Sequence, residues 1–206
     1  MESNTSALRS VYISIALTLA FLFSFSLNSG AQSVALKTNL AYDAATAANL
    51  GLEFGLAPRW TMDISGNYMP WKFYNRTSRK HAMVQPEFRY WFCDRFSGHF
   101  LGIHAHGGIY NATGEGIGDK VAFLGPDFSK LKDRRYEGWF AGGGISYGYA
   151  VILGKHWNME FEIGGGYAYF LSDVYECEEC GSKLDEGVPH HYFGVTKAAI
   201  SLVYVF

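Results

Sequence analysis

Two cysteines and two histidines near the end of the chain have the residue types and spacing of a metal site or a disulfide. Cys177 and Cys180 enclose two glutamates, and His190 and His191 follow in the same segment. Thiolates and imidazoles at such spacing can hold zinc in a tetrahedral site. The same two thiols can instead close a disulfide in an oxidising compartment. One Cys-x-x-Cys leaves disulfide, metal and free thiols open, and we take the disulfide as the leading interpretation.

A second candidate chemistry is nucleophilic catalysis by a serine with a histidine and an acid. His104 and His106 share one face of an expected strand, with Ser146 on the next strand and Glu162 beyond it. Such a set can carry acyl transfer and would make the protein a lipid-modifying enzyme. A lipid substrate, however, would require the site on an outer wall or at its rim. We therefore expect no catalytic residue and keep the enzyme as an alternative.

Two glycine triplets, at 142–144 and 164–166, lack the helix and the Lys-Ser/Thr of a phosphate-binding loop. Inside strands, glycines more often mark tight curvature or room for a large neighbour. We expect no cofactor. The chain has a formal net charge of −2, which does not favour nucleic acid as a partner.

The elements that position these residues show apolar and polar alternation with a period of two, broken by turn residues. No helical periodicity of comparable length follows the N-terminal segment. The alternation predicts eight strands, at 34–44, 48–56, 60–71, 81–92, 99–110, 138–153, 157–171 and 191–206.

The two faces of these strands differ in charge. One face is apolar and aromatic, from Val34 and Leu36 to Tyr204 and Phe206, and carries no Asp, Glu, Lys or Arg in any strand. A charge on a lipid-facing wall costs ~2–4 kcal/mol at the bilayer midplane. A water-soluble barrel has the reverse arrangement. The pattern therefore predicts an all-β, eight-stranded antiparallel up-and-down barrel of the outer-membrane type.

The opposite face carries the charged side chains and would line the interior. An eight-stranded barrel is only wide enough for its own side chains to fill. Unpaired charge there is costly, so we expect an ion-paired plug, with a narrow channel as the alternative. The predicted lumen network consists of Lys37, Glu53, Asp63, Glu87, Arg89, Glu160, Glu162 and Lys197.

The N-terminal 31 residues have the pattern of a signal peptide. An apolar, uncharged run from Val11 to Leu27 is followed by small residues at Ser29 and Ala31. We expect cleavage after residue 31, a mature barrel at 32–206 and export, with a retained membrane anchor as the alternative. Charged residues make up 17% of the chain, which is low for a soluble domain and suits a lipid-facing surface.

The lengths of the connections between strands indicate which end of the barrel faces the periplasm. Short turns follow residues 56, 92 and 153, whereas the segments 72–80, 111–137 and 172–190 are long, although the first connection on that side, at 45–47, is short. This asymmetry is typical of bacterial barrels with both termini in the periplasm. Cys93, in a short turn, is too far from the last long segment to pair with its cysteines. Pro86 lies mid-strand and predicts a local bulge, because it cannot donate to the ladder.

Several segments resemble a known family. The C-terminus, ending in Phe206, resembles the signal read by the barrel assembly machinery, although Ser201 stands where that signal usually has Gly. Nearly all of the mature chain is similar to a Bacteroidota family of small secreted proteins known only as a domain of unknown function. The motifs are Pro70-Trp71-Lys72-Phe73, Arg79-Lys80-His81, the run from Gln85 to Cys93, Gly98-His99-Phe100, Cys177-x-x-Cys180-Gly181 and the run from Tyr192 to Ala198, in which the family often has Pro at 195.

The resemblance implies an outer-membrane location, brings no catalytic residue, and places members often beside fimbrial genes. We therefore expect a non-enzymatic barrel that presents the long segments 111–137 and 172–190 for surface assembly, adhesion or envelope integrity. The expected partners are outer-membrane lipid and lipopolysaccharide, the assembly machinery, and fimbrial or other surface proteins. Lys130, Lys132, Arg134 and Arg135 suit lipopolysaccharide phosphates or an acidic partner, and a solvated loop explains them equally.

Overall fold

The structure is a computed structural model that describes residues 34–45, 47–69, 72–73, 77–113, 135–176 and 182–206. The chain divides into two units, Met1–Gln32 with Phe206, and Ser33–Val205, which contains every strand. The predicted signal peptide at 1–31 lies outside the described residues. Within the described residues, no helix has the length and apolarity needed to cross a membrane.

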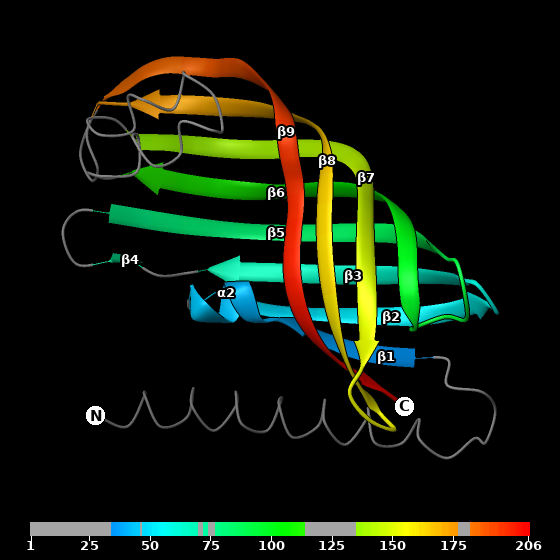
Figure 1. Cartoon of the computed structure of the whole chain (residues 1–206). Helices are drawn as coiled ribbons and strands as arrows, with labels where there is room; N and C mark the ends of the chain where they lie inside the picture. The colour runs from blue at the N-terminus through cyan, green and yellow to red at the C-terminus, as the bar shows by residue number, and fades with distance from the viewer. Residues whose placement is uncertain (1–33, 46, 70–71, 74–76, 114–134, 177–181) are drawn as a thin grey trace, which may run out of the picture. The chain divides into compact units, whose positions relative to one another are not determined.

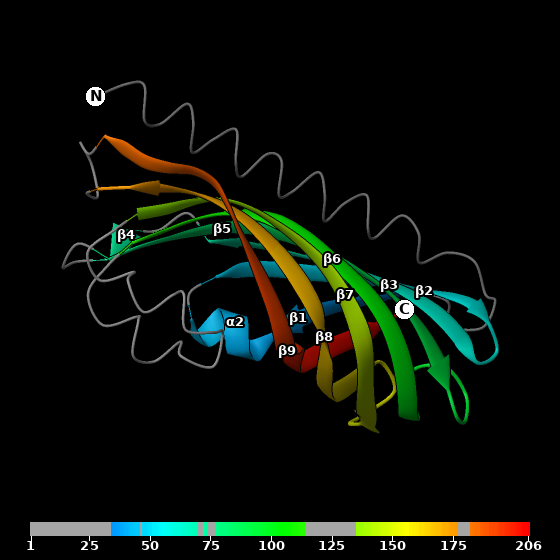
Figure 2. The same ribbon diagram turned by 90° about the horizontal axis from the view of Figure 1, so that it is seen from above.

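Eight strands pair antiparallel in sequence order, and the last pairs with the first (Figures 1 and 2). A two-residue strand, β4 (Lys72–Phe73), adds to β5 outside this ring. The predicted eight-stranded antiparallel fold is confirmed. The ring consists of β1 (Val34–Asn39), β2 (Ala48–Ala57), β3 (Trp60–Met69), β5 (Thr77–Trp91), β6 (Gly98–Thr113), β7 (Arg135–Ile152), β8 (Trp157–Tyr175) and β9 (Lys183–Val205).

The first strand is shorter than predicted, because a helix, α2 (Leu40–Ala44), replaces its second half. Asn39 is the N-cap: its backbone is still extended, and its side chain accepts a hydrogen bond from the Ala41 N–H at 3.0 Å. Tyr42, predicted on the outer wall, consequently lines an interior cavity. The expectation of a strand to residue 44 was therefore wrong.

Pro86 does not produce the predicted bulge. The pairing of β5 with β3 runs without a shift through Ile64 and Pro86. On the β6 side, pairing stops after Val84 and resumes at Glu87 in the same register. The missing N–H of proline is therefore accommodated by a local gap in one ladder rather than by an extra residue.

The end of the ring that carries the short turns, called here the turn end, is closed by an apolar floor. The floor consists of Ala35, Trp91, Phe96, Phe100, Ala150, Val203 and Val205, all buried. The turn between β5 and β6 folds inward over it. Asn158 holds this turn by donating its side-chain amide to the Phe96 carbonyl at 2.7 Å, and Phe96 adopts the left-handed region at φ 63°.

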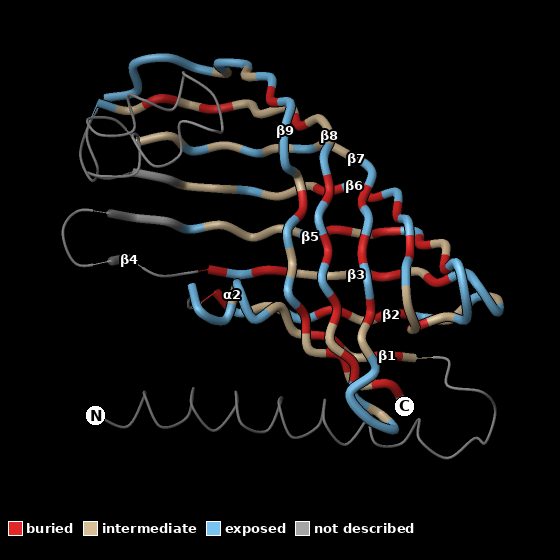
Figure 3. Tube along the Cα trace, viewed as in Figure 1, coloured by how far each residue is buried: buried red, intermediate tan, exposed pale blue. Residues whose placement is uncertain are grey.

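The opposite end, called the loop end, carries the long connections. Along the strands, buried and exposed residues alternate, and the exposed ones are the apolar ones (Figure 3). Ile103, Ile145 and Ile163 expose 68%, 69% and 61% of their surface. The outer wall is therefore apolar and the interior polar above the floor, as the alternation predicts.

Gly148 makes room for the floor. A Cβ at this position would lie 2.2 Å from the ring of Phe100. We expect Gly148→Ala to destabilise the barrel by about 1–3 kcal/mol, because the ring would have to leave its packed position. Gly154→Ala is the matched control, since a Cβ there meets no atom within 4 Å. Urea unfolding in detergent, followed by tryptophan fluorescence, measures both, and equal midpoints for the two variants would contradict this account.

Candidate functional site

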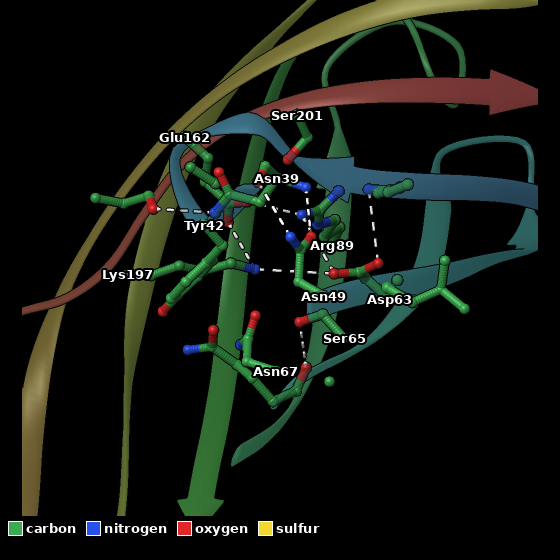
Figure 4. A pocket seen from close by; sticks show the side chains of 17 residues that line it. Asn39, Tyr42, Asn49, Asp63, Ser65, Asn67, Arg89, Glu162, Lys197 and Ser201 are labelled. Atoms are coloured by element: carbon green, nitrogen blue, oxygen red, sulfur yellow. Dashed lines mark hydrogen bonds and ion pairs between the residues drawn. The ribbon is translucent and has the colours of Figure 1, made fainter. Parts of the chain in front are cut away.

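The eight charged residues predicted for the lumen lie together in one buried layer above the apolar floor. Six strands contribute them, and none exposes more than 9% of its surface. Each lies on the inward face of its strand, which is why a period of two in the sequence brings them to one interior. Figure 4 shows part of this layer, where Asp63, Arg89 and Lys197 point toward one another.

Arg89 is the centre of the layer. Its two terminal nitrogens donate to Glu53 at 2.9 Å, Glu160 at 3.0 Å and Glu162 at 2.8 Å. Its Nε donates to Glu87 at 2.8 Å. A guanidinium offers five N–H donors in a fixed plane, so one side chain can neutralise carboxylates from three walls of the ring.

The two lysines, from the neighbouring strands β1 and β9, complete the pairing. Lys37 donates to Glu160 at 2.9 Å and also forms an ion pair with Glu53. Lys197 donates to Glu87 at 2.5 Å and lies 3.2 Å from Glu162. Asp63 lies 3.6 Å from both Lys37 and Arg89, so every carboxylate of the layer has at least one cation beside it, as buried charges require.

Neutral hydroxyls tie the layer to its surroundings. Thr61 donates to Glu53 and accepts from the Trp91 indole at 2.9 Å, which links the charged layer to the floor. Ser146 donates to Glu87. Thr61 has no distinguishing sequence signal, since an alternating strand contains many such hydroxyls.

A small cavity of about 50 Å³ adjoins the layer on the side of α2. Asp63 and Glu162 line it, together with Asn39, Tyr42 and Asn49. One carboxylate oxygen of Asp63 and one of Glu162 accept no hydrogen bond from the protein. The volume and the polar lining suit one or two water molecules that would complete these acceptors.

The candidate catalytic set is not arranged for nucleophilic attack. Ser146 donates to Glu87 rather than to a histidine, and Nε2 of His104 lies 2.9 Å from the Thr196 hydroxyl. His104, His106 and Ser146 are all buried in the interior, away from the apolar wall on which a lipid would lie. This geometry does not favour the lipid-modifying alternative.

The second candidate set is only partly described. Cys177 and Cys180, predicted as a disulfide or as metal ligands, lie outside the described residues. His190 and His191 are successive residues of β9, so their side chains lie on opposite faces. His191 hydrogen-bonds the Tyr167 hydroxyl at 2.6 Å. Within the described part of the chain, no three His, Cys, Asp or Glu residues form a group suited to a metal, and Cys93 is a free, exposed thiol.

A comparison with protein families shows the family to which the chain belongs. A model described as "Protein of unknown function (DUF3575)" matches residues 16–206. The chain belongs to this family. No curated protein and no solved structure matches it. The DUF3575 match confirms the expected membership in a family of unknown function.

Removal of the central cation tests the layer. We expect Arg89→Met to destabilise the barrel by about 3–5 kcal/mol, because Glu53, Glu87, Glu160 and Glu162 would lose their shared partner in a buried site. The control is Arg59→Met in an exposed turn, for which we expect a change within about 0.5 kcal/mol. Both are measured by urea unfolding in detergent. Similar losses in the two variants would show that the layer does not stabilise the fold.

Proposed function

We propose that this DUF3575 protein is an outer-membrane barrel of a Bacteroidota bacterium that presents its loop-end segments for assembly at the cell surface, including fimbria-associated assembly. The observation that carries the proposal is the reversed burial of the ring, with charges inside and apolar side chains outside. A water-soluble protein rarely exposes a continuous apolar surface of this extent.

The apolar wall has a sharp upper boundary. Lys80, Asn111, Glu137 and Asp173 are paired in turn across β5, β6, β7 and β8, and form one polar row on the outer face. The row next to it, toward the turn end, contains Ala82, Ile109, Trp139 and Leu171. Between His99 and Ile109, the outward residues of β6 carry no Asp, Glu, Lys or Arg. This length agrees with the roughly 9–11 residues that a tilted strand needs to cross a bilayer.

Aromatic side chains gather at both margins of the apolar wall. Near the turn end, Trp60 packs against Phe88 and Tyr90, with ring centroids 4.9 and 4.8 Å apart. Near the loop end, Trp139 packs on Tyr169. Such rings favour the membrane–water interface, because they combine an apolar body with a polar edge.

The interior supports a role at the surface rather than through the lumen. The apolar floor and the charged layer above it fill the interior of the ring. The parts that remain available to bind a partner are therefore the connections at the loop end. The segments 111–137 and 172–190 are the longest of these. Surface assembly, adhesion or envelope integrity would use them, with lipopolysaccharide beside the polar row as a neighbour and the barrel assembly machinery as a partner during insertion.

Membrane placement is tested by a charge on the outer wall. Ile103→Arg puts a cation inside the apolar band, where we expect a cost of about 2–4 kcal/mol and loss of the protein from the outer-membrane fraction. Asn111→Arg, on the same face of the same strand but in the polar row, should fractionate like the wild type. If Ile103→Arg were also recovered in full from the outer membrane, the apolar wall would not face lipid.

The display role is tested by removal of the loops. We expect a variant in which 114–134 and 177–181 are replaced by short Gly-Ser turns to insert normally but to lose its surface partners in pull-downs from outer membranes. A variant that lacks only one of the two loops should lose only some of these surface partners. Retention of every partner by the double deletion would contradict display by these segments.

A further inference from the structure

A groove crosses the outer wall near the loop end, over the neighbouring strands β3, β5 and β6 (Figure 1). Two hollows in this wall share Tyr68, Ala82 and Ile109, so they form one continuous groove, called here the wall groove. Its upper part borders the polar row at Lys80, and its lower part reaches into the apolar band at Val84. Ala82 is paired with both Tyr68 and Ile109, so a small side chain lies between two large, exposed ones and forms the bed of the groove.

Toward the turn end, the wall groove divides into two tracks, one on each side of Val84. Gly66 and Gly107 are paired with Val84 from opposite strands and form the beds of these tracks. Leu50 borders the first track, and the small side chain of Ala141 lies beside the second. A Cβ at Gly66 would meet no atom beyond its chain neighbours nearer than 3.9 Å, and one at Gly107 none nearer than 3.5 Å. Packing within the barrel therefore does not require glycine at either position, whereas the tracks depend on both.

The mouth of the wall groove, at the polar row, presents a cation. Lys80 is exposed and lies on the same face of β5 as Ala82. Among the described residues, no carboxylate pairs with Lys80. Glu137, two strands away in the same row, accepts a hydrogen bond from Asn111 at 3.2 Å and lies 3.8 Å from Arg135, so its charge is already engaged. The mouth can therefore receive an anion on Lys80.

The cation and the tracks are in line along β5. Lys80, Ala82 and Val84 are alternate residues on its outward face, so Lys80 lies about 13 Å above Val84 along the strand. The wall groove thus has a cationic mouth at the level of the polar row and, below it, two apolar tracks separated by one side chain. This arrangement complements an anionic amphiphile that has more than one acyl chain.

We propose that the wall groove binds one lipid A moiety of lipopolysaccharide, with a phosphate on Lys80 and acyl chains in the tracks beside Val84. The proposal rests on the orientation proposed above, which places the loop end in the outer leaflet, and it names the lipid that this part of the wall selects. An ammonium donates charge-assisted hydrogen bonds to a phosphate, and a chain seated in a track gains contacts that a flat wall does not provide. Lipid A distributes its chains over two sugar rings, which suits two separated tracks, whereas the glycerol of a phospholipid holds its two chains together.

The experiment measures lipid binding to the purified full-length protein in detergent by native mass spectrometry. The probes are lipid A, the same lipid A after enzymatic removal of its phosphates, and phosphatidylglycerol, an anionic phospholipid. We expect a one-to-one complex with lipid A, and binding of the dephosphorylated form that is about tenfold weaker. Phosphatidylglycerol should also bind at least about tenfold more weakly than lipid A, because its chains cannot occupy both tracks.

Two pairs of variants locate the complex on the wall. Lys80→Gln should weaken lipid A binding about tenfold and remove the preference for the phosphorylated form, whereas Lys155→Gln, exposed at the turn end, should change neither. Gly107→Leu fills one track and should weaken binding of both forms of lipid A about tenfold. Gly165→Leu is its matched control, since Gly165 is an exposed glycine of β8 with the same 3.5 Å clearance and lies outside the wall groove.

Three results would overturn the proposal. They are equal affinities for lipid A and phosphatidylglycerol, a Lys80→Gln variant that keeps the phosphate preference, and equal losses of binding in the two leucine variants. All three are measured in detergent and do not depend on cellular location, which Ile103→Arg tests separately.

Discussion

The fold depends on one constraint: five carboxylates and three cations must neutralise one another in a narrow lumen that side chains largely fill. Arg89 meets this constraint by bonding four of the carboxylates, from β2, β5 and β8. The two lysines come from β1 and β9, the first and last strands. The charged layer therefore bonds together strands that are far apart in sequence, including both sides of the seam where the ring closes.

The same constraint determines where glycine is needed. The inward side chains of the layer are long, so positions beside them must be small. A Cβ on Gly102 would lie 2.0 Å from a carboxylate oxygen of Glu87, and one on Gly142 would lie 2.7 Å from His106. At Gly138, Gly144 and Gly166, an added Cβ would first meet the backbone of the neighbouring strand, so these glycines allow the strands to approach closely. Lumen side chains and close strand approach together account for most glycines on the inward face of β6, β7 and β8, as expected from the sequence.

Alternation with a period of two was sufficient to predict the ring and the inward face, because within the apolar band charge is excluded from the outer face of every strand. It did not predict which carboxylate pairs with which cation, since that depends on register and rotamer. The helix α2 was missed because Leu40 and Tyr42 continue the alternation, while the signal that ends β1 is a single N-cap, Asn39. The loop-end extensions of β5 and β9 were missed for another reason. Outside the apolar band neither face is excluded from water, and the sequence loses its periodicity there.

The seam between β1 and β9 contains only five residue pairs, from Ala35–Val205 to Asn39–Ser201. It joins the first and last strands of the ring, so it requires the largest loop closure of any pairing in the ring. The other strand pairs join neighbours in sequence and can zip from their turns. Closure of the cylinder is thus the kinetically demanding event of its folding, and its rate depends on a short contact. Until that contact forms, the β1 edge and the whole length of β9 present an open sheet, which is the state that an assembly factor would have to protect.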